Sequence, residues 1–326
     1  MLALSRRDVL ELLPLADCVD AVERAFRLHA EKRTLGPGVL GVPAVDGSFH
    51  VKVAGLLGER RYFAAKTNAN FPDNPRRHGL PTIQGTVVLA DAGNGRPLAL
   101  MDSASVTALR TGAATAVAAK FLARRDARTA TIVGCGAQAE TQLAALAAVL
   151  PLRRVWVLDS DHARAEAFAA RAAASLGMPV EARKDLREAV SASDVCVTCT
   201  PARRAFLGVA DVRPGTFVAA VGADNRGKQE LEPTLVASAT LVVDILEQCA
   251  EIGELQHALA AGLITREGVH AELGDVIAGR RPGRTRDDEI TIFDSSGTAL
   301  QDVAAAIAVY EKARATGRGT EVTLDD

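Results

Sequence analysis

Residues 129–140, TATIVGCGAQAE, join a β-branched run to a glycine-rich turn and the start of an alanine-rich helix. The pattern G-x-G-x-x-A at 134–139 is typical of turns that bind dinucleotides. The first glycine permits a tight turn, and the second lets the backbone approach a pyrophosphate. The backbone N–H groups at the mouth of the helix then face the phosphates. A glycine turn that binds no nucleotide is the alternative. The predicted cofactor contacts in this turn are Gly134, Gly136, Ala137 and Gln138.

The next extended run, RVWVLD, ends in Asp159. An acidic residue about 20 positions beyond the glycine turn holds the ribose hydroxyls in such sites. A carboxylate here repels a 2′-phosphate, and the following residue is Ser160 rather than an arginine. We therefore predict NAD(H) as the cofactor in preference to NADP(H). NADP(H) remains an alternative because Arg164 lies nearby in the sequence and could pair with a 2′-phosphate.

The predicted secondary structure differs between the parts of the chain before and after residue 126. From Asp126 onward, strand-like and helix-like stretches alternate, which predicts a doubly wound parallel sheet with helices on both faces. Between Gly36 and Pro97, short extended runs alternate with turn signals such as PDNP and DAGNGRP, which predicts an antiparallel β region. Further helices are predicted within 5–32, 103–125, 247–279 and 298–316.

Length and composition limit the class of protein. With 326 residues the chain is long enough for about two domains, and its 48% hydrophobic and 24% charged residues are ordinary for a globular protein. The net charge of −2 and 4% aromatic residues argue against nucleic acid as a partner. The sequence contains no run of about 18 uninterrupted apolar residues, so no membrane span is predicted. Arg6, Arg7 and Asp8 interrupt the N-terminal apolar run that a signal peptide needs.

The five cysteines are scattered, which predicts a reducing, cytoplasmic setting. Cys196 and Cys199 form a C-x-x-C within DVCVTCT, a run expected to be a strand, where residues three apart point to opposite faces. We therefore interpret them as structural rather than as a metal or redox pair. The six histidines are dispersed and match no zinc spacing, so no metal site is predicted.

The segment 79–143, which contains LRTGAA and GCGAQ, resembles the ornithine cyclodeaminase/μ-crystallin family, whose signature segments are L-R-T-x-A-A and G-x-G-x-Q. VGADNRGKQEL at 221–231 and IFDSSGTALQD at 292–302 resemble two further family segments. The resemblance implies an α/β subunit of two parts that forms a homodimer. A discontinuous α+β substrate-binding and dimerisation domain would comprise residues 1–115 and 299–326, and an NAD-binding Rossmann domain residues 116–298.

The resemblance also implies roles for single residues. Lys66, one of only seven lysines, matches the family lysine that contacts the substrate carboxylate or imine, and Asp224 matches the catalytic acid/base. Arg110 is expected on a buried helix, where its charge needs an anionic partner from a cofactor phosphate or a substrate carboxylate. The remaining implied cofactor contacts are Thr82, Arg110, Thr111, Thr200, Val221, Gly222, Lys228 and Ser295, and Ser296 is an implied substrate contact.

One departure from the family affects the substrate. Members that act on amino acids usually carry an arginine before residue 50, whereas 34–59 contains no arginine and Val39 stands near the expected place. His50 and Lys52 are the basic residues of that interval. Two alternatives follow: Lys52, Lys66 and Arg110 bind a substrate carboxylate, or the substrate lacks one.

The predicted activity is that of an NAD(H)-dependent oxidoreductase acting on C–N bonds, an imine reductase or amino acid (amine) dehydrogenase that transfers hydride to or from carbon. The first alternative is an ornithine or lysine cyclodeaminase, which releases ammonia without net redox change. The second is a non-catalytic, μ-crystallin-like binder of small ligands.

Overall fold

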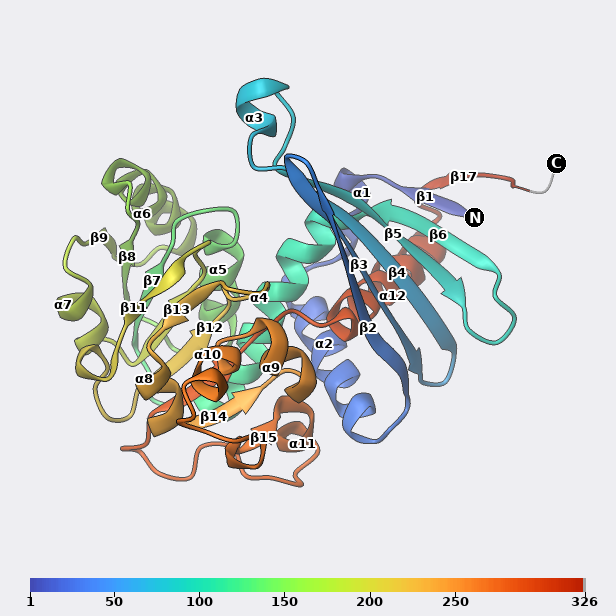
Figure 1. Ribbon diagram of the computed structural model, residues 1–326. Helices are drawn as coiled ribbons and strands as arrows, with labels where there is room; N and C mark the ends of the chain where they lie inside the picture. Colours follow the sequence, from blue (N-terminus) through green and yellow to red (C-terminus); the bar gives the residue numbers. More distant parts are fainter. Residues whose placement is uncertain (325–326) are drawn as a thin grey trace. The chain divides into compact units, whose positions relative to one another are not determined.

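The computed structural model describes residues 1–324, which divide into two compact units (Figure 1). The first comprises Met1–Arg110 together with the residues from Thr298 onward, and the second comprises Thr111–Gly297. The chain passes from the first unit to the second within helix α4 (Ser103–Leu122), and the crossing predicted after residue 115 falls in the same helix. The last two residues of the predicted segment 299–326 lie outside the described residues.

In the described part of the first unit, the strands form a seven-stranded sheet in the order β17-β1-β6-β5-β4-β3-β2. Strands β2 to β6 are antiparallel neighbours, as the turn signals predict, and β1 adds in parallel to β6. The strands are β1 (Leu2–Leu4), β2 (Thr34–Ala44), β3 (Gly47–Leu57), β4 (Arg61–Asn70), β5 (Ile83–Asp91), β6 (Pro97–Asp102) and β17 (Thr320–Glu321). The accompanying helices are α1 (Arg6–Leu12), α2 (Leu15–Ala30) and α3 (Asn74–Arg77).

Helix α12 (Ala299–Thr316) completes the core of this unit. The Thr298 side chain caps its first turn, and Gly317 ends it with φ 65°, a left-handed conformation that suits glycine. The helix packs on α2 and on strands β3 and β4, where Figure 1 shows it in red. Because most of its side chains are buried, the last helix of the chain supplies the hydrophobic face that the N-terminal sheet needs.

The second unit is of the Rossmann type, as predicted. Its described strands form an eight-stranded parallel sheet in the order β15-β14-β16-β12-β10-β7-β8-β9, in which the strand order reverses at β7. The strands are β7 (Thr129–Val133), β8 (Arg154–Leu158), β9 (Val180–Ala182), β10 (Val195–Thr198), β12 (Phe217–Ala220), β14 (Thr240–Val243), β15 (Ala271–Glu272) and β16 (Thr291–Asp294). A separate pair consists of β11 (Arg203–Leu207) and β13 (Gln229–Leu231). The helices are α5 (Ala139–Val149), α6 (His162–Leu176), α7 (Leu186–Ser191), α8 (Pro233–Ser238), α9 (Leu246–Ile252), α10 (Leu255–Ala260) and α11 (Leu273–Ile277).

The helical region predicted at 247–279 is wrong in its extent. The chain forms three short helices, α9, α10 and α11, with strand β15 between the last two. Gly253 ends α9, and Gly262 turns the chain after α10 with φ +66°. Glycines at these two places interrupt what the apolar pattern suggests is one helical region.

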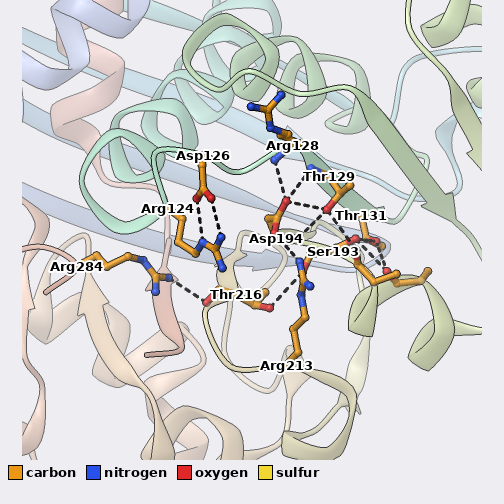
Figure 2. Close-up of polar contacts among 12 residues, drawn as sticks. Arg124, Asp126, Arg128, Thr129, Thr131, Ser193, Asp194, Arg213, Thr216 and Arg284 are labelled. Atoms are coloured by element: carbon orange, nitrogen blue, oxygen red, sulfur yellow. Dashed lines mark hydrogen bonds and ion pairs between the residues drawn. The ribbon is translucent and has the colours of Figure 1, made fainter. Parts of the chain in front are cut away.

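Polar contacts tie the amino ends of the central strands together, as Figure 2 shows. The Asp194 carboxylate, just before β10, accepts hydrogen bonds from the backbone N–H groups of Arg128 (2.8 Å) and Thr129 (3.0 Å) at the start of β7. It also accepts from the Thr129 hydroxyl (2.9 Å) and from the guanidinium of Arg213 (2.5 Å), which precedes β12. These contacts fix one edge of the sheet, opposite the carboxyl ends at which α/β proteins bind ligands.

The cysteine thiols are all free, and all five cysteines lie within the described residues. Cys196 is buried in β10, and the Cys199 thiol just beyond it donates to the carbonyl of Gly134 (3.2 Å). Burial raises the pKa of both thiols, which makes them poor nucleophiles and metal ligands. Among residues 1–324, no helix is both long and apolar enough to cross a membrane.

Candidate functional site

The glycine turn after β7 has the geometry of a dinucleotide site. Gly134 has φ +100°, and a Cβ there would lie 2.9 Å from Thr200 Cγ2, so only glycine fits. A Cβ on Gly136 would meet no atom of the described residues within 4 Å, which leaves open space where a pyrophosphate would approach. Helix α5 follows without a side-chain cap on its first N–H groups, so they can donate to an anion. The residues present therefore fit a dinucleotide.

Asp159 follows β8 and lies beside this turn. Its side chain is almost buried, and its carboxylate accepts hydrogen bonds from the backbone N–H groups of Cys135 (2.8 Å) and Asp161 (2.9 Å). Arg164 Nη1 lies 3.6 Å from the same carboxylate. Arg164 thus pairs with Asp159, and the carboxylate remains where it would repel a 2′-phosphate.

The predicted contacts in the second half of the sheet gather at its carboxyl edge. Thr200 follows β10, Val221 and Gly222 follow β12, and Ser295 follows β16, and these three strands are neighbours. The buried Ser295 hydroxyl has no hydrogen-bond partner among the described residues, so it is available to a ligand. The parallel topology brings these positions together because the carboxyl ends of adjacent parallel strands share one edge.

Asp224 lies in the loop after β12, and its side chain is 52% exposed. Lys228 Nζ donates to Asp224 Oδ1 over 2.5 Å, so two predicted site residues are paired with each other. The pairing holds the carboxylate in one place while its exposure leaves it accessible to protons and to substrate.

In the first unit, a buried charge cluster surrounds Lys66. Lys66 lies on β4 and is 3% exposed, and its Nζ donates to Asp302 Oδ1 on α12 over 2.8 Å. Arg110 Nε on α4 lies 2.9 Å from the same oxygen, and Arg110 Nη1 donates to Gln301 Oε1 (2.6 Å). Two buried cations therefore share one carboxylate oxygen, while Asp302 Oδ2 has no hydrogen-bond partner among residues 1–324.

Strand register places Lys52 beside this cluster. Val39 on β2, Lys52 on β3 and Lys66 on β4 form one row across the sheet, so their side chains share a face. An arginine at position 39 would extend this row of cations, but the residue there is Val39. Lys52 lies between Val39 and Lys66 in the row.

The electrostatics of the cluster make Lys66 able to exchange a proton near neutrality. Burial lowers the pKa of Lys66 to about 7, although Asp302 favours the charged amine, and Arg110 and Lys52 lower the pKa further. Burial alone would raise the pKa of Asp302, but Lys66 and Arg110 hold it below its usual value. The carboxylate is therefore ionised, and Lys66 is the group whose charge can change.

A comparison with protein families matches residues 1–317 to the description "Ornithine cyclodeaminase/mu-crystallin family". The chain belongs to this family. The resemblance found in LRTGAA and the other segments is thereby confirmed over nearly the whole chain.

Similar proteins within the family carry out related reactions. An alanine dehydrogenase of Archaeoglobus fulgidus is 39% identical over 321 residues, which is 98% of each chain. A solved archaeal alanine dehydrogenase dimer with bound NAD is 39% identical with a TM-score of 0.94 and covers 99% of each chain. The Δ1-pyrroline-2-carboxylate reductase of Thermococcus litoralis, solved with NADH and L-proline, is 35% identical with a TM-score of 0.94 over 99% of this chain and 100% of its own.

Of the remaining predicted contacts of this family member, one is already engaged in internal hydrogen bonds. The Ser296 hydroxyl donates to Asp244 Oδ1 (2.6 Å) and accepts from Gln248 Nε2 (2.9 Å), so its predicted substrate contact competes with internal bonds. Thr82 is half-buried just before β5, and Thr111 is buried at the start of the second unit. Their predicted cofactor contacts stay predictions.

Sequence reasoning missed Asp302 and Gln301 as site residues. Both belong to the family segment IFDSSGTALQD, but an aspartate in the first turn of a helix is ordinarily explained by the helix dipole. The signal that could have identified Asp302 is the need of buried Arg110 for an anionic partner. The anion expected from a cofactor phosphate or a substrate carboxylate is supplied by the chain itself, from Asp302.

Proposed function

We propose that this chain is an NAD(H)-dependent oxidoreductase acting on C–N bonds, an imine reductase or amino acid dehydrogenase. The observation that carries the proposal is the buried cluster in which Lys66, with a pKa near 7, and Arg110 share the single carboxylate of Asp302. A lysine that exchanges a proton near neutrality suits chemistry at an amine or imine nitrogen. The relatives, alanine dehydrogenase and pyrroline-2-carboxylate reductase, are named for such reactions.

The cluster also supports a substrate with a carboxylate. When Lys66 is protonated, two buried cations face one carboxylate, and a buried charge without a partner is costly. A substrate carboxylate would supply the second negative charge, and the guanidinium of Arg110 presents the planar donors that bind carboxylates. Of the two alternatives left by the missing arginine, we therefore favour a substrate whose carboxylate is bound by Arg110, Lys66 and Lys52.

The second unit would bind the dinucleotide. We propose that Gly134, Gly136 and the start of α5 bind the pyrophosphate and that Asp159 binds a ribose, with NAD(H) preferred over NADP(H). NADH, when bound, supplies the hydride that reduces an imine carbon, and NAD+ accepts it in the reverse direction. Asp224, exposed and held by Lys228, would accept or donate the proton that accompanies the change at nitrogen.

The first test is reductive amination with matched substrates. Purified protein is incubated with NADH, ammonia and either a keto acid such as pyruvate or the matched ketone acetone, and NADH absorbance is followed. We expect NADH consumption with a keto acid. Turnover with the ketone should be at least roughly 100-fold lower, because the buried cations are then left without the substrate's carboxylate. No NADH consumption with any keto acid or with Δ1-pyrroline-2-carboxylate would refute the proposal.

The same assay separates the alternatives. Release of ammonia from ornithine or lysine without net NADH formation would instead establish the cyclodeaminase reaction, and tight ligand binding without any turnover would establish a binding protein. Lys66→Met should lower kcat by about 10²- to 10⁴-fold, and Lys184→Met, which replaces an exposed lysine of the second unit, is the matched control.

We further propose that the partner of this chain is a second copy of itself. The face of the first sheet opposite Lys66 carries exposed apolar side chains, including Leu40 at 60% exposure. Val42, Phe49 and Val88 extend this apolar face, and patches of this kind mark protein interfaces. The archaeal alanine dehydrogenase was solved as a dimer.

The dimer is tested by sedimentation velocity with Leu40→Glu. We expect the wild-type chain to sediment as a dimer and the variant as a monomer. Leu263→Glu, a similarly exposed leucine (49%) in the second unit, should remain dimeric. A monomeric wild type would refute the proposal. We also propose a reducing, cytoplasmic location, which the five free thiols support.

A further inference from the structure

Of the fully buried carboxyl groups at the carboxyl edge of the second unit's sheet, Asp244 after β14 accepts hydrogen bonds from the Ser296 hydroxyl (2.6 Å) and the Gly297 backbone N–H (2.7 Å). Three others form one connected series and have no part in the function proposed above. They belong to Glu230 on β13, Glu254 just before α10, and Asp294 at the end of β16. Burying an acidic group costs free energy unless hydrogen bonds satisfy its oxygens, so each of these carboxyl groups needs hydrogen-bond donors close by.

Each of these carboxyl groups holds the backbone of the next. Asp294 accepts hydrogen bonds from the backbone N–H groups of Glu254 (3.0 Å) and Leu255 (2.9 Å). Glu254 in turn accepts from the backbone N–H groups of Glu230 (2.7 Å) and Leu231 (3.1 Å). The end of β16 thus fixes the start of α10, and that segment fixes β13.

Glu230 completes the series at two strand ends. One carboxylate oxygen accepts from the backbone N–H of Thr200 (2.6 Å), after β10. The other accepts from the backbone N–H of Gly222 (2.8 Å), after β12, and from the hydroxyl of Thr198 (2.7 Å). A single side chain therefore fixes two loops that are predicted to contact the cofactor.

Two glycines show that the chain makes room for these groups. A Cβ on Gly222 would lie 2.4 Å from the carboxyl carbon of Glu230, and one on Gly253 would lie 2.5 Å from Asp294 Oδ2. The Cβ on Gly222 would also lie 2.4 Å from the backbone carbonyl oxygen of Thr200, so Glu230 and the Thr200 backbone together require glycine at position 222. Burial raises the pKa of all three carboxyl groups, that of Glu254 to about 9 and that of Asp294 to about 7, so the series does not carry three full negative charges at neutral pH.

We propose that Glu230 is a positioning residue for the nicotinamide half of the dinucleotide, and that Glu254 and Asp294 hold Glu230 in place. The inference rests on the proposed NAD(H)-dependent function. Asp159 follows β8 on one side of β7 and would bind the adenosine ribose, whereas β10 and β12 lie on the other side, where the second nucleotide half binds in such sheets. Glu230 therefore acts on the loops of the nicotinamide half alone.

The test compares two ligands that share the adenosine half. The binding of NADH is measured by fluorescence titration and that of ADP-ribose by calorimetry, for wild type and Glu230→Gln. The amide of glutamine places a donor against a backbone N–H, so NADH should bind roughly 10- to 100-fold more weakly. ADP-ribose, which lacks the nicotinamide, should bind within about twofold of wild type, because no contact of the adenosine half is lost. Glu247→Gln, which makes the same change at an exposed glutamate of the same unit, is the control and should alter neither affinity.

Two results with Glu230→Gln would overturn the proposed positioning role. Equal NADH affinity in wild type and Glu230→Gln overturns the inference, and so does an equal loss for NADH and ADP-ribose, which would assign Glu230 a merely structural role. A wild-type chain that binds no NADH refutes the proposed function and this inference with it. If Glu230→Gln does not fold, Thr198→Val decides, since it removes one donor to Glu230 with little change of shape. We expect it to weaken NADH binding several-fold and ADP-ribose binding not at all, and unchanged NADH binding overturns the inference.

Discussion

The replacement Asp302→Asn tests the charge cluster around Lys66 most directly. Asparagine keeps the size of the side chain and removes the negative charge that Lys66 (2.8 Å) and Arg110 (2.9 Å) share. Both cations stay buried in the variant, so the protein must either tolerate an uncompensated charge or release a proton.

The size of the effect follows from these distances. With an effective dielectric constant of about 20, unit charges 2.8 Å apart attract by roughly 6 kcal/mol, and removing one partner of a buried pair costs about 3–5 kcal/mol. Lys66 can release its proton at little cost because its pKa is about 7. Arg110 cannot, since a guanidinium stays charged. We therefore expect the variant to lose about 3 kcal/mol of unfolding free energy at pH 8.

The loss should grow as the solution becomes more acidic. In the wild type, Lys66 is protonated below pH 7 in both the folded and the unfolded state, so its contribution to stability is constant there. In the variant, the folded-state pKa of Lys66 lies lower still, because the carboxylate that favoured the charged amine is gone. Folding then expels a proton below pH 7, and the deficit increases by up to about 1.4 kcal/mol per pH unit.

Urea unfolding at pH 8 and pH 6 measures both quantities. The control is Asp17→Asn, which removes an exposed ion pair to Lys312 (3.1 Å) in the same unit and should cost less than about 1 kcal/mol at either pH. In parallel, the seven lysines are labelled with 13C and titrated by NMR, and the Lys66 signal is assigned with Lys66→Met. The reasoning is refuted if Asp302→Asn costs no more than Asp17→Asn and leaves the Lys66 titration unmoved.

Three further perturbations have expected results. Lys66→Met should lower kcat by about 10²- to 10⁴-fold in steady-state assays while NADH still binds with wild-type affinity, since Lys66 lies in the first unit and the proposed dinucleotide contacts lie in the second; weakened NADH binding would contradict that assignment. Asp194→Asn should destabilise the protein by roughly 1–3 kcal/mol at neutral pH. Burial would raise the pKa of Asp194, but the N–H groups of Arg128 and Thr129 and the Thr129 hydroxyl hold it below its usual value. The wild-type advantage should therefore disappear as the pH falls below about 4, and a constant difference between chemical unfolding curves down to pH 2 would exclude this account. Asp159→Ser should raise the ratio of kcat/KM for NADPH to that for NADH by roughly tenfold or more, because the repulsion of the 2′-phosphate is removed; an unchanged ratio would show that Asp159 does not select the cofactor.

The parts of the fold that were predictable depend on local patterns. The glycine turn, its strand and its helix lie within 129–149, and short turns join β2 to β3, β3 to β4 and β5 to β6. Short-range periodicity and turn chemistry are sufficient for such elements. The three short helices within 246–277 were not predictable to the same degree, because buried contacts such as that of Gly253 with Asp294 determine where they end.

The candidate site was predictable only residue by residue. The resemblance identified Lys66 and Arg110, but their shared partner Asp302 lies 236 positions after Lys66 in the chain. A pairing at that separation is set by how α12 packs on β4, which no local pattern encodes. The same holds for Glu230, whose neighbours Thr200 and Gly222 are brought together by the order of the strands.

The return of α12 to the first unit has a consequence for the newly made chain. The ribosome completes all of the second unit before it synthesises α12, so that unit can fold while the N-terminal strands still lack the helix that covers them. During this interval Lys66 and Arg110 have no Asp302, and the apolar side chains that pack on α12 are exposed. The charge cluster therefore forms only after α12 has been synthesised, and a chain that stops before residue 302 would contain all of the second unit but an incomplete first unit.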